Sequence, residues 1–188
     1  QQYPVANAVW LSFMTTGGYQ DPGYWSREGW ERLAAGTGGP AHWRKDAAGN
    51  WHGIGLNGPF ELMPEEPVTG ISHDEASAFA NWLAQQGGEQ AGAVVQHEYQ
   101  WEVATRTRAI TDYGRAWEWC ANLFQPYSGY RTPEIAEAAT AEFDDRHYSL
   151  RGASLHTQPC LRRTSLRNRA LPQSRELFTG VRLVFPPR

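Results

Sequence analysis

The chain has 188 residues and a mass of 21.1 kDa, enough for one domain with a sizeable hydrophobic core. Its mean hydropathy is −0.61 and no apolar run approaches the ~20 residues of a membrane span, which excludes a transmembrane protein. The formal net charge of −3 and the presence of a single lysine, Lys45, argue against nucleic acid as a partner.

The first helix is predicted over residues 7–16. The segment begins with an asparagine that could cap it, places Trp10, Phe13 and Met14 at helical spacing, and ends at a Gly-Gly pair. These signals are typical of a short amphipathic helix.

A second helix is predicted to begin after Ser72, because Ser72 and Glu75 have the spacing of a capping box. Apolar residues then recur at i, i+3, i+4 and i+7 until Gly87 and Gly88 stop the pattern. The residues predicted to be buried are Ala76, Phe79, Ala80 and Leu83.

A third helix is predicted over residues 98–106, burying Trp101 together with Ala104 or Thr105, and strands are predicted over 148–151 and 180–185. In an extended segment the rings of Trp117 and Trp119 would share one face and Glu118 the other. Packing in the core is the expected role of both indoles.

Residues 151–188 contain eight arginines and one acid, Glu176. A guanidinium group donates hydrogen bonds in a rigid fork, so we expect these side chains to tie loops together rather than to bind a ligand. The arginines considered for this role are Arg151, Arg163, Arg167 and Arg182. The acidic, alanine-rich segment 132–145 is predicted to be a mobile loop.

The two cysteines suggest neither a disulfide framework nor a zinc site, because Cys120 and Cys160 lie far apart in the sequence. A reducing compartment, the cytoplasm, is therefore expected. The chain starts at Gln1 with no recognisable leader, so we expect it to be processed or to be a piece of a longer protein.

The six histidines contain no pair three or four residues apart, so no local iron motif is present. His73, Asp74 and Glu75 could suggest a metal cluster, but their place in a first helical turn favours capping and macrodipole roles. Ser154 and His156 would share one face of a strand, yet nothing identifies an acid to orient the histidine, so a nucleophile–base pair is not favoured.

Seven segments in this order resemble one family. They are residues 3–7 (YPVAN), 67–72 (PVTGIS), 98–104 (EYQWEVA), 117–119 (WEW), 150–154 (LRGAS), 163–168 (RTSLRN) and 178–182 (FTGVR). Together they resemble the formylglycine-generating-enzyme-like domain, also called the sulfatase-modifying-factor domain. The resemblance covers nearly the whole chain. It implies a single α+β domain over residues 1–188, loop-rich, with an elaborated C-type-lectin-like fold.

Within that superfamily the chain is most similar to the C-terminal domain of ergothioneine sulfoxide synthases and their selenoneine synthase relatives, through residues 17–19 (GGY), 126–130 (PYSGY) and the Arg-Asn ending. This resemblance implies an oxygen-dependent enzyme that joins a thiol or selenosugar donor to a trimethylated histidine. It also implies non-heme Fe(II), held by three histidines of an N-terminal, helical, DinB-like domain that this sequence lacks. No metal ligand is therefore assigned to this chain, which would supply the substrate pocket.

The resemblance also implies site residues. Asn168 matches an asparagine that holds the acceptor, whereas Arg169 stands where an aromatic or acidic residue is common. Ser174 falls at the position of an arginine that grips the donor in some relatives. Tyr130 is the nearest candidate for a tyrosine that assists catalysis.

The chain departs from the family in several places, among them residues 94–97 (VVQH), where an Arg-Leu-Pro-Thr segment is usual. Formylglycine-generating enzymes use two cysteines in the segment where this chain has only Cys160, so that activity is not expected. Twelve residues, 105–116, replace a considerably longer excursion.

A second hypothesis is a non-enzymatic ligand-binding module on the same lectin-like scaffold. What precedes Gln1 in the gene would discriminate between the two.

Overall fold

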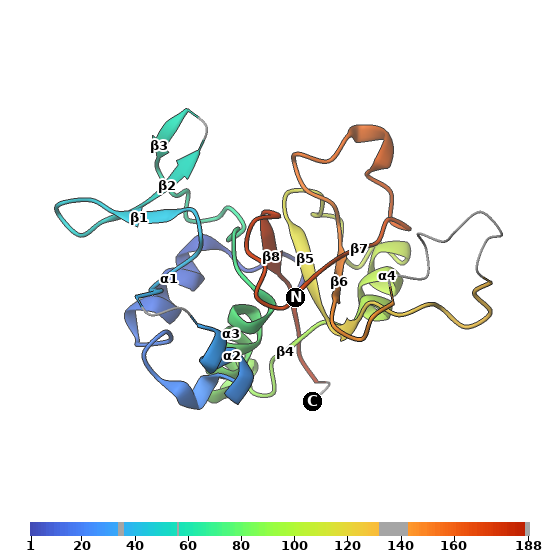
Figure 1. Ribbon diagram of the computed structural model, residues 1–188, viewed down its shortest axis with the longest axis horizontal. Coiled ribbons are helices and arrows are strands. Elements are labelled where there is room, and N and C mark those ends of the chain that lie inside the picture. The colour runs from blue at the N-terminus through green and yellow to red at the C-terminus, as the bar shows by residue number, and fades with distance from the viewer. Residues whose placement is uncertain (34–35, 56, 132–142, 187–188) are drawn as a thin grey trace.

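Short helices and short strands are interspersed along the chain, as the predicted α+β class requires (Figure 1). The computed structural model describes residues 1–33, 36–55, 57–131 and 143–186. The helices are α1 (Asn7–Thr15), α2 (Arg27–Arg32), α3 (His73–Gln85) and α4 (Glu98–Arg106), with 3₁₀ turns η1 (Pro22–Tyr24), η2 (Gly88–Gln90) and η4 (Pro159–Leu161).

A four-stranded sheet with the order β7-β6-β5-β8 organises the molecule. Its strands are β5 (Trp117–Leu123), β6 (Tyr148–Arg151), β7 (Asn168–Ala170) and β8 (Thr179–Val181). Strand β8 is parallel to β5, the other pairings are antiparallel, and β7 is an edge strand. Figure 1 shows α1, α2 and α3 on one side of this sheet and α4 on the other.

Two smaller sheets complete the fold. Strands β1 (Trp43–Lys45), β2 (Trp51–Gly55) and β3 (Gly58–Phe60) form an antiparallel sheet that projects from the body (Figure 1). Strand β4 (Val94–Val95) pairs with β9 (Leu183–Val184). The predicted strand 180–185 is therefore divided between two sheets, with Arg182 between the two strands.

The predicted helices are confirmed, with one correction. Ser72 and Glu75 form both hydrogen bonds of a capping box at the start of α3, and α4 has the predicted bounds. Asn7 does not cap α1, because it is the first helical residue and its Nδ2 donates to the Met63 carbonyl at 2.9 Å. A contact distant in sequence thus takes up the side chain that the local pattern assigned to the cap.

The main core lies between α1, α3 and the four-stranded sheet. Trp10 stacks on Phe79 with ring centroids 4.8 Å apart, and Phe13 packs edge-on against Phe79. Both Trp117 and Trp119 belong to this core, and the Nε1 of Trp119 donates to the Ile71 carbonyl at 2.9 Å. The prediction that these indoles pack in the core is confirmed.

On the α4 side, the sheet carries buried ion pairs. Arg182 and Glu118 are joined by two hydrogen bonds of 2.8 and 2.9 Å, with both side chains almost fully buried. Arg167 binds Glu98 through two contacts of 2.8 Å, and Arg151 lies 3.6 Å from the same carboxylate.

The predicted bridging role is confirmed for Arg151, Arg167 and Arg182. It is wrong for Arg163, whose side chain is exposed and forms no hydrogen bond or ion pair within the described residues.

Three further predictions concern membrane-spanning helices, the two cysteines and the acidic segment. Among the described residues, no helix is long and apolar enough to cross a membrane. Cys120 is buried and Cys160 exposed, and both are free thiols. Most of the acidic segment predicted to be mobile, residues 132–142, lies outside the described ranges.

Candidate functional site

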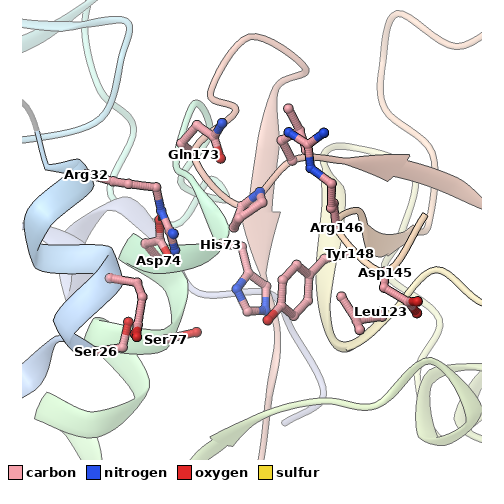
Figure 2. Close-up of a pocket in the computed structure, with 13 residues that line it drawn as sticks. Ser26, Arg32, His73, Asp74, Ser77, Leu123, Asp145, Arg146, Tyr148 and Gln173 are labelled. Carbon is pink, nitrogen blue, oxygen red and sulfur yellow. Dashed lines mark hydrogen bonds and ion pairs between the residues drawn. The ribbon is translucent and has the colours of Figure 1, made fainter. Parts of the chain in front are cut away.

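A cavity of 650 Å³ opens where α2, the start of α3 and the start of β6 meet (Figure 2). Figure 2 shows Arg32 and Asp74 on one side and Asp145 and Arg146 on the other, with the rings of His73 and Tyr148 between them. The full lining is Ser26, Glu28, Arg32, His73, Asp74, Ser77, Leu123, Asp145, Arg146, Tyr148, Leu171, Pro172 and Gln173.

His73 is the most buried polar group of this cavity. The residue is 8% exposed, and its Nε2 has no hydrogen-bond partner among the described residues. Its ring stacks on Tyr148 with centroids 3.7 Å apart and meets the edge of Trp119. Burial lowers the pKa of His73 to about 4, although the carboxylate of Asp74 and the backbone of Cys120 act in the opposite direction. The imidazole is therefore neutral at neutral pH.

The acids beside His73 have structural roles. Asp74 receives two hydrogen bonds from Arg32, at 2.7 and 2.9 Å. Glu75 completes the capping box and accepts a 2.6 Å hydrogen bond from the buried hydroxyl of Tyr19. Capping is confirmed for Glu75, whereas Asp74 forms an ion pair instead.

The residues present do not fit an iron site. Within the described ranges, no three His, Cys, Asp or Glu side chains gather closely enough to hold a metal ion. The Nε2 of His73, which has no hydrogen-bond partner among the described residues, could supply one metal ligand. The carboxylate of the neighbouring Asp74 is already paired with Arg32.

Asn168 and Arg169 lie side by side on the edge strand β7. The backbone N–H of Arg169 donates to Asn168 Oδ1 at 2.9 Å. This N–H therefore points away from β6, and its hydrogen bond holds the Asn168 amide at the outer edge of the sheet. The two side chains start from opposite faces of the strand. Asn168 pairs with Leu150 of the α3-side core, whereas the Arg169 guanidinium lies 5.5 Å from the centre of the Phe124 ring.

Tyr130 lies in a cluster of three aromatic rings. Phe124 stacks on Phe143 at 5.5 Å, and Tyr130 meets Phe143 edge-on at 5.4 Å. Through Phe124 this cluster adjoins Arg169, so Tyr130 and Arg169 are linked through the rings of Phe143 and Phe124. Tyr130 is 45% exposed, which leaves its ring accessible.

Ser174 lies in the turn that directly follows β7. Its backbone N–H donates to the Leu171 carbonyl at 2.9 Å and closes this turn. The turn residues Leu171, Pro172 and Gln173 line the cavity, whereas Ser174 itself does not.

Sequence reasoning missed Phe124, Phe143, Arg146 and Tyr148. Phe124 and Tyr148 had a recognisable signal, because they follow or begin extended segments that enter the same sheet. Phe143 and Arg146 had none, since they belong to the end of an acidic loop and no regular pattern covers them.

Ser154 and His156 do not form a nucleophile–base pair. The Ser154 hydroxyl lies 3.5 Å from Thr157 Oγ1, and the His156 ring packs on Phe178 with centroids 4.3 Å apart. Both residues are in a loop after β6 rather than on a strand. The expectation that they are not catalytic partners agrees with this geometry.

Comparison with known proteins places these observations in a family. A family model described as sulfatase-modifying factor enzyme 1-like domain matches residues 1–113. Hercynine oxygenase of Mycobacterium tuberculosis is 28% identical over 228 residues, and hercynine oxygenase of Mycolicibacterium smegmatis is 29% identical over 233 residues. Both alignments cover 97% of this chain and 51% of the relative. The chain thus spans about half the length of the curated relatives it matches.

Proposed function

Because this chain belongs to the family of sulfatase-modifying factor enzyme 1-like domains, we propose that it supplies the acceptor-binding part of an oxygen-dependent oxidoreductase. The proposed acceptor is hercynine, a trimethylated histidine, since the relatives that match 97% of the chain are hercynine oxygenases. The observation that carries the proposal is the arrangement at β7, where an amide, a guanidinium and an aromatic cluster meet at an open sheet edge.

The chemistry of hercynine suits this edge. The Nδ2 of Asn168 makes no hydrogen bond to the described residues, so it can donate one to a carboxylate while Oδ1 is held by the Arg169 N–H. A quaternary ammonium favours aromatic faces, and Tyr130 with Phe143 and Phe124 offers exposed ring surface. Trp117 and Trp119 cannot take this role, because both are buried in the core.

The edge of β7 also allows one ligand to contact side chains that start from opposite faces of the strand. A ligand that lies against the edge of β7 can reach Asn168 on one side and Arg169 on the other. In this arrangement Arg169 binds an anionic group of the acceptor or donor, Tyr130 is the candidate catalytic residue, and Ser174 shapes the turn beside the site.

Further parts of the proposal concern the whole protein. We place non-heme Fe(II) on a separate N-terminal helical domain, and a sulfur or selenium donor as the second substrate. The two free cysteines are compatible with a reducing compartment such as the cytoplasm. The single domain over residues 1–188 is proposed to have a C-type-lectin-like scaffold, which its loop-rich mixture of short helices and strands supports.

Calorimetric titration with hercynine tests the proposal, on the full-length enzyme and on the 188-residue chain. Asn168→Ala should weaken binding by about 1–3 kcal/mol, the cost of leaving a polar partner unpaired. Asn168→Asp should weaken binding at least as much, because it places a second negative charge against the carboxylate. Hercynine affinity that is unchanged in both variants would show that the acceptor does not bind at this edge. Binding by a full-length protein that consumes no oxygen would favour the non-enzymatic binding module.

A further inference from the structure

A second cavity, distinct from that of Figure 2, opens beside β1. Its volume is 520 Å³, and it is lined by residues 36–41, Trp43–Lys45, Trp51 and Arg175. Figure 1 shows β1 to the left of β8 and β7 to its right, so this cavity lies away from the edge proposed for hercynine. A cavity of this size accommodates a small metabolite.

The walls of this second cavity are cationic, although the formal net charge of the chain is −3. The described residues that line it include Arg44, Lys45 and Arg175 but no carboxylate. Lys45 is the only lysine of the sequence. Arg175 is neutralised by the buried carboxylate of Glu75, to which its Nη2 donates at 3.0 Å. The uncompensated charge of the cavity therefore comes from Arg44 and Lys45.

These two cations are held in place without an acidic partner among the described residues. The Arg44 guanidinium donates to the backbone carbonyls of Ala41 and Trp43, at 3.0 and 2.7 Å. The Lys45 ammonium lies 5.1 Å from the centre of the Trp51 ring. Charges of one sign that line a cavity raise the local concentration of ligands of the opposite sign. The cavity thus suits an anion.

The acids closest in sequence to these cations face elsewhere. The carboxylate of Asp46 accepts hydrogen bonds from the backbone N–H and the Nδ2 of Asn50, at 2.8 and 3.2 Å. Glu176 accepts a 3.0 Å hydrogen bond from the backbone N–H of Arg175. Neither acid lines the cavity, so neither occupies the place of an anionic ligand.

A glycine-rich loop, residues 36–39 (GTGG), adds backbone donors to the same cavity. None of its N–H groups donates a hydrogen bond to the described part of the chain. A Cβ on Gly38 would meet no atom within 4 Å, so packing does not require glycine at this position. Glycine lets a ligand approach the backbone closely, and successive N–H groups in such loops bind anions. Cations together with free N–H groups favour a phosphate, which has several acceptor oxygens on one centre.

We propose that this cavity binds a phosphate group, with its oxygens on Arg44, Lys45 and the N–H groups of the loop 36–39. A phosphate monoester has a charge of about −1.5 to −2 at pH 7, which matches the two uncompensated cations. The ligand is a small phosphorylated molecule or free phosphate, since both present the same oxygens. The inference goes beyond the proposed function and does not depend on it, because neither Asn168 nor Arg169 lines this cavity.

The test is a titration of the 188-residue chain labelled with ¹⁵N-glycine, followed by NMR at constant ionic strength. The probes are inorganic phosphate, glycerol 3-phosphate and succinate, a dianion without phosphorus. Both phosphate probes should shift the amide signals of Gly36 and Gly38 to saturation, and the tighter of the two identifies the source of the phosphate group. Succinate should bind about tenfold more weakly. Succinate that binds as tightly as phosphate, or amide signals that no probe shifts, would overturn the proposal.

Three variants complete the test. Arg44→Gln and Lys45→Gln change exposed side chains, and each should weaken phosphate binding about tenfold without changing the melting temperature. Arg27→Gln is the matched control, because it removes the same charge from an arginine that is 86% exposed, pairs with Glu31 and does not line the cavity.

Equal losses of affinity in all three variants would show a general effect of net charge and refute the site. Unchanged affinity in both Arg44→Gln and Lys45→Gln would refute it as well. Hercynine and Asn168 take no part in these titrations, so their outcome is independent of the acceptor proposal.

Discussion

Arg167 offers the sharpest test of how the sheet is held together. Its guanidinium donates two 2.8 Å hydrogen bonds to Glu98 and a third of 2.8 Å to the Gln125 carbonyl. It also lies between the rings of Phe124 and Tyr127, at 4.3 and 4.1 Å from their centres. One side chain thus joins α4, the end of β5 and the segment that leads into β7.

The expected cost of Arg167→Ala follows from these contacts. Removing one partner of a buried ion pair costs about 3–5 kcal/mol, because a carboxylate is left buried without its counter-charge. The Glu98 side chain is 3% exposed, but it retains Arg151 at 3.6 Å and hydrogen bonds from Tyr127, Asn122 and Ser149. These remaining partners favour the lower end, about 3 kcal/mol. Burial raises the pKa of Tyr127 to about 12, so its hydroxyl stays a donor throughout the accessible pH range.

Urea unfolding followed by circular dichroism measures this cost, and Arg163→Ala is the matched control. Arg163 belongs to the same basic segment but is exposed, so its loss should change the free energy of unfolding by less than about 0.5 kcal/mol. For a chain of this size, about 3 kcal/mol corresponds to a fall in Tm of roughly 6–12 °C. A loss below about 1 kcal/mol for Arg167→Ala, or equal losses for both variants, would refute the role assigned to burial.

Three other predictions concern pH, packing and metal. Since the pKa of His73 is about 4 in the folded chain and 6.5 in an unstructured peptide, the unfolded chain binds more protons between these values. Stability should therefore fall by up to about 3 kcal/mol as the pH decreases from 6.5 to 4, and His73→Phe should flatten this slope in urea titrations. Gly180→Ala would put a Cβ 2.5 Å from the Val68 carbonyl oxygen and should cost about 1–3 kcal/mol, whereas Gly38→Ala meets nothing within 4 Å and should be neutral by thermal melting. The 188-residue chain should bind ferrous iron no better than background in anaerobic titration, and stoichiometric, histidine-dependent uptake would contradict this.

The elements that the sequence predicted best are those specified by local chemistry. The capping box of Ser72 and Glu75 fixes the start of α3, and the spacing of Trp101 and Thr105 fixes the buried face of α4. By contrast, Asn7 has a partner 56 residues away, at Met63, and no local rule could reveal it. For the same reason the sequence predicted one strand where residues 179–184 form two strands in two different sheets.

The candidate site was harder to predict because it is assembled from distant segments. The family resemblance directed attention to Asn168 and Arg169, but not to the opposite faces from which their side chains start. The sequence correctly places His73 in a first helical turn, but its burial against Tyr148 depends on a strand 75 residues later. Arg146 follows an acidic stretch without periodicity, so only the folded arrangement draws attention to it.

The position of β8 has a consequence for how the protein is made. The Val5 backbone donates to the Val181 carbonyl, β8 lies parallel to β5, and Arg182 neutralises the buried carboxylate of Glu118. A nascent chain in which β8 is still inside the ribosome therefore has an open sheet and an unpaired acid. Closure must wait until residues 179–182 have emerged, and contacts between segments so distant in sequence form slowly. A translating ribosome would carry an incomplete core until then, and a chain in that state is prone to aggregate.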